Sequence, residues 1–286
     1  MKEKKEYNLE EESYDMELSK AYDEAIKLSA LKRNPKLKDF FEDNGVYLNL
    51  DYLNSHLLKQ LEKDELLKTY KNEYSRFYSD DKKTRCKMCS IASSSRYCYL
   101  KYRKSGFKFE AIRNNGQCKP HLDAYDDSTN TYFECKCHEI VKPHEITLSQ
   151  DAYEEHLINI FGVSKEHIKC SDDSTKIELN YEMFGIKDAK LPIGKYFDFK
   201  QLVCHIIGLL GEEVKPNPTL QYVFFIPDED VMQENVLDWK NKFKDHVKDL
   251  FENIKQNIKL NGRPLEEAIT LKYSFVEVSL IDDLIK

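Results

Sequence analysis

Glycine and proline are scarce in this chain, with only 9 glycines and 8 prolines among 286 residues. These residues interrupt helices and strands, so their scarcity indicates long regular elements. No apolar run approaches twenty residues and the mean hydropathy is -0.67, which excludes a transmembrane helix and a membrane partner. Residues 1–6 lack the apolar core of a signal peptide. These absences favour a cytoplasmic protein.

A regular cysteine framework is also missing. The 8 cysteines are scattered, unlike the paired spacing of a small secreted domain. Cys86 and Cys89 have the spacing of half a zinc site, and Cys98 with Cys118 or His121 could complete it only with irregular spacing. The sequence therefore leaves a structural zinc site open.

The hydrophobic content is sufficient for a folded core, because 41% of the residues are hydrophobic and 12% are aromatic. This composition excludes global disorder. Periodicity predicts helices within residues 1–80 and strands within 106–141. Further elements are predicted in order: a helix at 151–161, a buried helix at 198–211, an apolar strand at 220–227, an amphipathic helix at 231–260 and a strand at 274–278.

This order predicts a mixed α/β fold. We expect a helical N-terminal region at 1–80 and a second region at 81–286, within which 142–197 is an insertion after the third strand.

The charge is unevenly distributed. The chain carries a net charge of -7, yet Glu110 is the only acid between residues 82 and 113, a tract rich in lysine and arginine. Such a tract is typical of contact with a phosphate backbone. The expected DNA contacts are Arg96, Lys101, Arg103 and Lys104. The alternative is a solvated basic loop neutralised by the acidic N-terminus.

Residues 119–140 contain the strongest candidate for chemistry. Asp123 lies on one strand-like run, Glu134 and Lys136 lie on the next, and turn-forming residues 126–130 separate them. Residues two apart on a strand share a face, so a hairpin would bring Asp123 close to Glu134 and Lys136. Two carboxylates suit Mg²⁺ or Mn²⁺, and a lysine beside the ion can position water. The alternative is a surface hairpin whose Glu–Lys pair contributes a few tenths of a kcal/mol.

The chain resembles the PD-(D/E)XK nuclease superfamily at Asp123, Glu134 and Lys136, with Pro120 shortly before the aspartate. The resemblance implies a restriction-endonuclease-like αβββαβ core. It also implies that Asp123, Glu134 and the main-chain carbonyl of Cys135 hold the metal, while Lys136 positions the attacking water. Two departures are His-Leu between Pro120 and Asp123, and the long segment 142–197.

Three further residues extend the candidate site. The resemblance implies that Glu110 is an additional catalytic metal ligand and that Gln201, on the helix after the Glu-x-Lys strand, reaches the site. His138 could contact a phosphate. Ordinary alternatives remain open: an edge-strand glutamate, a core pair of Gln201 and His205 with satisfied hydrogen bonds, and a histidine bonded at the sheet end.

The resulting expectation is a Mg²⁺-dependent endonuclease that hydrolyses DNA phosphodiester bonds, either a restriction endonuclease or a related defence or repair enzyme. Duplex DNA is the expected partner, and cutting both strands would favour a homodimer. A non-catalytic nucleic-acid-binding module is the alternative. A third possibility is a helical interaction protein whose acidic N-terminal region is the working surface.

Overall fold

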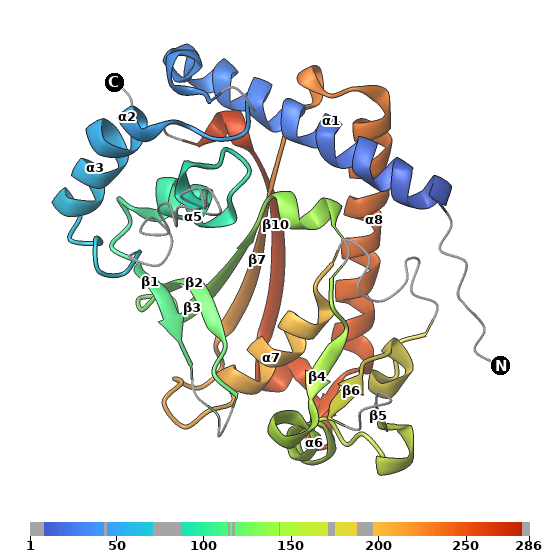
Figure 1. Ribbon diagram of the computed structural model, residues 1–286. Coiled ribbons are helices and arrows are strands. Elements are labelled where there is room, and N and C mark those ends of the chain that lie inside the picture. Colours follow the sequence, from blue (N-terminus) through green and yellow to red (C-terminus); the bar gives the residue numbers. More distant parts are fainter. Residues whose placement is uncertain are drawn as a thin grey trace.

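The computed structural model describes residues 9–42, 45–70, 87–113, 115, 118–142, 144–170, 175–187 and 197–281. A mixed sheet forms its centre, with helices on both faces (Figure 1). The strand order is β1-β2-β3-β7-β10, with bounds Lys108–Ile112, His121–Asp126, Thr131–Lys136, Thr219–Ile226 and Thr270–Glu277. The expected mixed α/β class is confirmed.

Strands β1, β2 and β3 are antiparallel, whereas β7 runs parallel to both β3 and β10. The β2–β3 turn forms because Asp126 accepts hydrogen bonds from Ser128 N and Oγ at 2.9 and 2.6 Å. Asn130 ends the turn at φ 51°, a left-handed conformation that asparagine tolerates better than most residues. The predicted hairpin is thus present, with Asp123 on β2 and Glu134 on β3.

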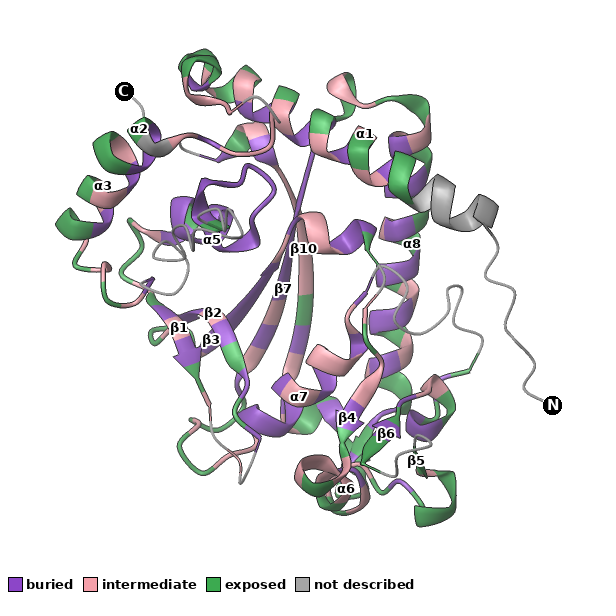
Figure 2. Cartoon of the chain, viewed as in Figure 1, coloured by how far each residue is buried: buried purple, intermediate pink, exposed green. Residues whose placement is uncertain are grey.

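Strand β7 is the apolar strand expected at 220–227, and most of it is buried (Figure 2). Helix α7 (Phe199–Leu209) precedes it, and helix α8 (Glu234–Asn257) joins it to β10. Asp198 caps α7 by accepting a hydrogen bond from Gln201 N at 2.8 Å. The cap fixes where the helix begins, and hence where its inward-facing residues fall.

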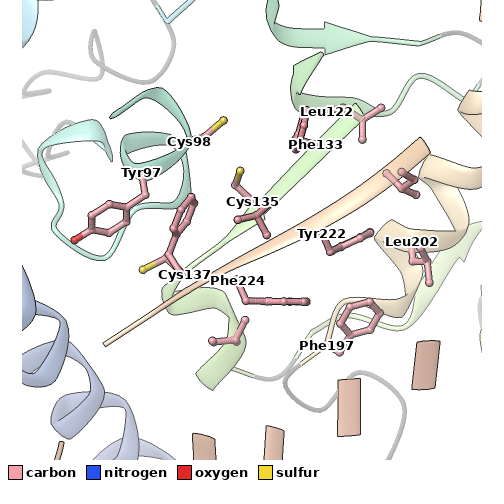
Figure 3. Close-up of a cluster of buried hydrophobic side chains, with 14 of the residues drawn as sticks. Tyr97, Cys98, Leu122, Phe133, Cys135, Cys137, Phe197, Leu202, Tyr222 and Phe224 are labelled. Carbon is pink, nitrogen blue, oxygen red and sulfur yellow. The ribbon is translucent and has the colours of Figure 1, made fainter. Parts of the chain in front are cut away.

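The two faces of the sheet are covered differently. Tyr222 and Phe224 face α8, with ring centroids 5.8 Å from Phe251 and 5.2 Å from Phe243. On the opposite face, α5 (Ser94–Tyr102) packs Tyr102 against Phe133 at 4.8 Å. Figure 3 shows Cys98 of α5 close to Cys135 of β3. Cys135 and Cys137 are fully buried, as expected for small apolar residues.

Helix α1 (Leu9–Arg33) lies across the carboxyl ends of β7 and β10 (Figure 1). Tyr22 OH donates to Phe225 O at 3.0 Å, and Ser29 Oγ accepts from Asp228 N at 2.8 Å. The helical N-terminal region therefore shares one hydrophobic core with the sheet. It continues through a 3-10 helix, α2, a π-helical segment and α3, with bounds Pro35–Phe40, Leu50–Tyr52, Leu53–Leu57 and Leu58–Lys63. The expectation for residues 71–80 lies outside the described residues.

The segment expected as an insertion carries its own small antiparallel sheet, in the order β4-β6-β5, packed with α6. Its bounds are Thr147–Ser149 (β4), Gln150–Asn159 (α6), Lys169–Cys170 (β5) and Lys176–Glu178 (β6). A two-stranded ribbon pairs Lys259–Leu260 (β8) with Arg263–Pro264 (β9). The remaining 3-10 helices are Lys87–Cys89, His138–Val141, Lys165–His167, Tyr181–Phe184, Glu229–Val231, Leu265–Glu267 and Val278–Leu280. Within the described ranges, no helix combines the length and apolar character needed to span a membrane.

Candidate active site

The strand registers place three acidic residues in a row. Phe109 pairs with Ala124 and Ala111 with Leu122, so Glu110 lies opposite Asp123. Ala124 pairs with Phe133, which puts Asp123 opposite Glu134. Directly opposite residues share a face of the sheet. The φ of 52° at Glu110 interrupts the regular strand geometry at that point, and among the described residues no three acidic side chains gather into a group that could hold a metal ion. The structure therefore does not bring Glu110 together with Asp123 and Glu134 as a third metal ligand.

Asp123 is built into the junction between β2 and β3. The β2–β3 pairing runs from Asp126–Thr131 to Ala124–Phe133. The Asp123 carboxylate accepts the next β3 amide, Cys135 N, at 2.6 Å. A side chain thus takes the place of a backbone acceptor, which fixes the carboxylate beside Glu134.

Lys136 connects strand β3 to helix α7. Its Nζ donates to Glu134 Oε1 at 2.6 Å and to Gln201 Oε1 at 2.5 Å. Glu134 is only 3% exposed, and Lys136 and Gln201 are half-buried. The structure therefore brings together Asp123, Glu134, Lys136 and Gln201, four of the residues selected from the sequence.

His205 and Tyr222 support the same carboxylate from behind. His205 Nε2 lies 3.6 Å from Glu134 Oε2, and its Nδ1 lies 3.1 Å from Tyr222 OH. Burial, together with the charge of Lys136, lowers the pKa of His205 to about 3, so this histidine is neutral. The sequence pointed to His205 one turn from Gln201 but gave no sign of Tyr222. The register Glu134–Tyr222 follows only from strand pairing.

Burial dominates the electrostatics of the site. It raises the pKa of Asp123 well above its ordinary value, and the neighbouring Glu134 raises it further. Burial also raises the pKa of Glu134, against the opposing effect of Lys136. Burial alone would lower the pKa of Lys136, but Glu134, Glu139 and Asp123 together raise it above its ordinary value. The site therefore strongly favours an added positive charge.

The donor set fits a hard cation better than zinc. Among the described residues, no three histidine, cysteine, aspartate or glutamate side chains form a metal-binding group. Two carboxylates suit Mg²⁺, which keeps several waters, whereas structural zinc takes four protein ligands. Of the two cysteines with zinc-site spacing, Cys86 lies outside the described residues and Cys89 is buried.

One expected DNA contact is wrong. Arg96 is 2% exposed, and its guanidinium donates to Tyr52 OH at 2.8 Å and to Met88 O at 3.4 Å. Arg96 thus holds the N-terminal region against α5 and cannot reach a phosphate backbone. Lys101 and Lys104 are exposed and Arg103 is half-buried, so these three remain candidates.

His138 does not continue the Glu134–Lys136 face, because β3 ends at Lys136 and His138 begins a 3-10 helix. The next residue, Glu139, is a site neighbour that the sequence analysis missed. Its Oε1 accepts from Ser94 Oγ at 2.7 Å and its Oε2 accepts from Cys137 N at 2.9 Å. Burial opposes its ionisation, but Lys136 and these donors lower the pKa of Glu139. Its place three residues after the end of the Glu-x-Lys strand was the available signal.

Comparison with protein-family models, curated proteins and solved structures finds no match to this chain.

Proposed function

We propose that this protein is a Mg²⁺- or Mn²⁺-dependent endonuclease that hydrolyses phosphodiester bonds in DNA. The observation that carries the proposal is the Lys136 ammonium, held 2.6 Å from Glu134 and 2.5 Å from Gln201, with Asp123 on the adjacent strand. Two converging carboxylates with a lysine between strand and helix are the parts required for metal-assisted phosphodiester hydrolysis.

The order of the elements supports the same proposal. Helix α5, strands β1, β2 and β3, helix α7 and strand β7 occur in this order, with the segment that carries β4, α6, β5 and β6 between β3 and α7. That order corresponds to the αβββαβ core of the PD-(D/E)XK nucleases, the superfamily that the hairpin motif resembles. In this assignment Asp123 and Glu134 occupy the motif positions on the second and third strands.

Each residue has a role in the proposed reaction. When bound by Asp123 and Glu134, Mg²⁺ would neutralise charge at the scissile phosphate and make water a better nucleophile. An ammonium group has three donors, so Lys136 retains one for the attacking water or a phosphate oxygen. Gln201 orients Lys136, and His205 with Tyr222 keeps Glu134 in place. A contribution from Glu110 would rest on the family resemblance alone.

Duplex DNA is the proposed substrate. Lys101 and Lys104 are exposed, and lysine side chains at a protein surface commonly contact phosphate groups. Cutting both strands would favour a homodimer, since the substrate has two-fold symmetry.

The test is cleavage of supercoiled and linear duplex DNA with Mg²⁺, Mn²⁺ or EDTA. Wild-type protein should cut only with a metal ion. Glu134→Gln and Lys136→Ala should reduce the rate by roughly 100-fold or more, because each removes a charge at the reacting phosphate. Glu178→Gln, an exposed position on β6, is the matched control and should cut normally.

Folding of each variant is checked by circular dichroism, so that lost activity reports chemistry. A folded Glu134→Gln protein that cuts as fast as wild type would overturn the proposal. Metal-independent, salt-sensitive DNA binding without cleavage would instead favour the non-catalytic binding module.

A further inference from the structure

A cavity of about 510 Å³ opens beside the candidate active site, between helix α1 and the segment that follows β3. We propose that this cavity is a phosphate-binding subsite, which holds a phosphate group of the bound nucleic acid strand next to the reacting bond. The inference rests on the proposed nuclease function for its substrate, but its own test does not require cleavage.

The cavity adjoins the catalytic residues. His138 and Glu139 line it and lie two and three residues after Lys136 in the chain. Lys87, which precedes α5, is another lining residue. A phosphate in the cavity would therefore lie beside the segment that continues from the catalytic strand.

The lining provides the donors that phosphate oxygens require. Ammonium groups come from Lys87 and Lys142, both of which are exposed, and hydroxyl groups come from Ser19 and Ser93. Ser93 is also the N-cap of α5, so the positive end of that helix faces the same space. Lysines and hydroxyls around a helix N-terminus form a set suited to an anion.

His138, another lining residue, is held in one orientation by hydrogen bonds. Its Nδ1 lies 2.5 Å from Asp23 Oδ1, and its Nε2 lies 3.2 Å from Ser19 Oγ. The backbone amide of His138 donates to Ala92 O at 3.3 Å. Contacts with Ser19 and Asp23, both on α1, thus fix the imidazole, and the Ser19 hydroxyl is the group that an entering phosphate can engage.

The two carboxylates that line the cavity already have donors of their own. Asp23 bonds to His138, and both oxygens of Glu139 accept hydrogen bonds from Ser94 and Cys137 N. These hydrogen bonds satisfy the carboxylate oxygens, although both groups keep their negative charge. The exposed Lys87 and Lys142 offset that charge on the lining.

Ser19 contacts His138 and His138 contacts Asp23, which is also the order of contacts in a hydrolase triad. Ser19 lies in the interior of α1, where backbone N–H groups bond within the helix. Such amides cannot form the oxyanion hole on which acyl transfer depends. We therefore assign the three residues to binding rather than to nucleophilic catalysis.

The experiment measures binding in EDTA, by fluorescence anisotropy of labelled oligonucleotides with a 5′-phosphate or a 5′-hydroxyl, and with inorganic phosphate as competitor. Lys142→Gln and Ser19→Ala remove a cavity donor each. Lys169→Gln, an exposed lysine on β5 away from the cavity, is the matched control. We expect Lys142→Gln to weaken binding about 5- to 10-fold at low salt and to reduce the salt slope by about one, with Lys169→Gln unchanged.

The two substrates distinguish the source of the phosphate. If the subsite takes a terminal phosphate, the 5′-hydroxyl oligonucleotide binds wild type as weakly as Lys142→Gln binds the phosphorylated one. If it takes an internal phosphate, Lys142→Gln weakens both oligonucleotides equally. Either outcome supports the subsite, even in a protein that never cleaves DNA.

Wild-type affinity and salt slope in both Lys142→Gln and Ser19→Ala would overturn the subsite, as would absence of any binding by the folded wild-type protein. If the two cavity variants bind like wild type, the nuclease proposal would still stand, provided that wild type cleaves DNA with a metal ion and Glu134→Gln does not. The two proposals therefore fail separately.

Discussion

Lys136 balances the charges of the candidate site. It is the cation at the centre of the site, and its ammonium contacts both a strand carboxylate and a helix amide. Without that ammonium the buried Glu134 would carry an uncompensated charge, which is costly in a poorly solvated place. The residue thus stabilises the site while remaining the best group to act on a phosphate.

The raised pKa of Asp123 gives a stability prediction with a definite sign. A carboxyl group whose pKa is higher in the folded state stabilises the fold below its unfolded pKa, about 3.9. This contribution is lost as the pH rises through the folded value. Asp123→Asn should therefore raise the free energy of unfolding at pH 8, by on the order of 1 kcal/mol, and the gain should shrink towards pH 4. Urea unfolding in EDTA measures this difference.

Asp127→Asn is the control, because the pKa of Asp127 is shifted in the opposite direction to that of Asp123. Asp127 is exposed on the hairpin turn, and its hydrogen bond from Lys215 lowers its pKa. Its contribution is present at high pH and lost as the pH falls, so this variant should not be stabilised at pH 8. Adding Mg²⁺ should stabilise wild type and not Asp123→Asn, by binding to the folded state. Equal stability of wild type and Asp123→Asn at every pH would contradict the burial argument.

Arg96 shows what residue type alone leaves open. In the sequence it belongs to the same basic tract as Lys101 and Lys104. In the structure its guanidinium lies 5.0 Å from the ring centre of Tyr52, inside the protein. Tyr52 comes from a helix far away in the chain, so the partner that buries Arg96 exists only after folding. Helical periodicity around Arg96 could not reveal it.

At the scale of elements, the position of α7 depends on a close contact with the chain before β2. Gly208 of α7 packs on Pro120, and an added Cβ at Gly208 would lie 2.2 Å from Pro120 Cγ and 2.8 Å from Cδ. Pro120 was first noted only as part of the nuclease-like motif. The structure gives this ring a packing role that sets the distance between α7 and the sheet.

Gly208→Ala should therefore destabilise the protein by about 1–3 kcal/mol, although alanine favours helices by about 1 kcal/mol over glycine. The displaced helix should also weaken the Gln201–Lys136 contact and lower the rate of DNA cleavage. Chemical denaturation and the cleavage assay measure the two effects. The double variant Gly208→Ala/Pro120→Ala removes the clash. Its loss of unfolding free energy should therefore be smaller than the sum of the losses in the two single variants. A Gly208→Ala protein as stable as wild type would contradict this packing argument.

Most elements were predictable because their local patterns were strong. The helix expected at 198–211 is α7, and the strand expected at 220–227 is β7. Boundaries were less accurate. The last strand begins at Thr270 rather than 274, because parallel pairing with β7 extends it beyond its own apolar run. Pairing partners, which local patterns do not encode, decide where a strand starts.

At the scale of the whole molecule, helix α1 is part of the fold and not a separate appendage. It covers the carboxyl ends of two parallel strands and lines the cavity beside the site. Removing residues 1–80 would expose this core, so lost activity after such a deletion would not identify an interaction surface. The third functional possibility therefore needs point variants on the exposed face of α1.

Tyr22→Phe tests how strongly α1 is coupled to the sheet. Tyr22 is fully buried, and its hydroxyl donates to Phe225 O at 3.0 Å and to Cys137 O at 3.4 Å. Losing this donor removes a buried hydrogen bond between α1 and the sheet, which should cost about 0.5–1.5 kcal/mol in unfolding free energy. Tyr181→Phe is the control, because within the described residues the buried Tyr181 hydroxyl has no hydrogen-bond partner. That variant should match or exceed wild-type stability, and equal losses in both would contradict the role of Tyr22.

The sequence by itself determined the mixed α/β class, the hairpin and the pairing of Asp123 with Glu134 and Lys136. Each depends on periodicity and turn chemistry within a short stretch of chain. Only the tertiary structure decided that Gln201 contacts Lys136, that Arg96 is internal and that α1 shares the core. These contacts join residues far apart in the chain, and their energies depend on burial and distance, which exist only once the chain has folded.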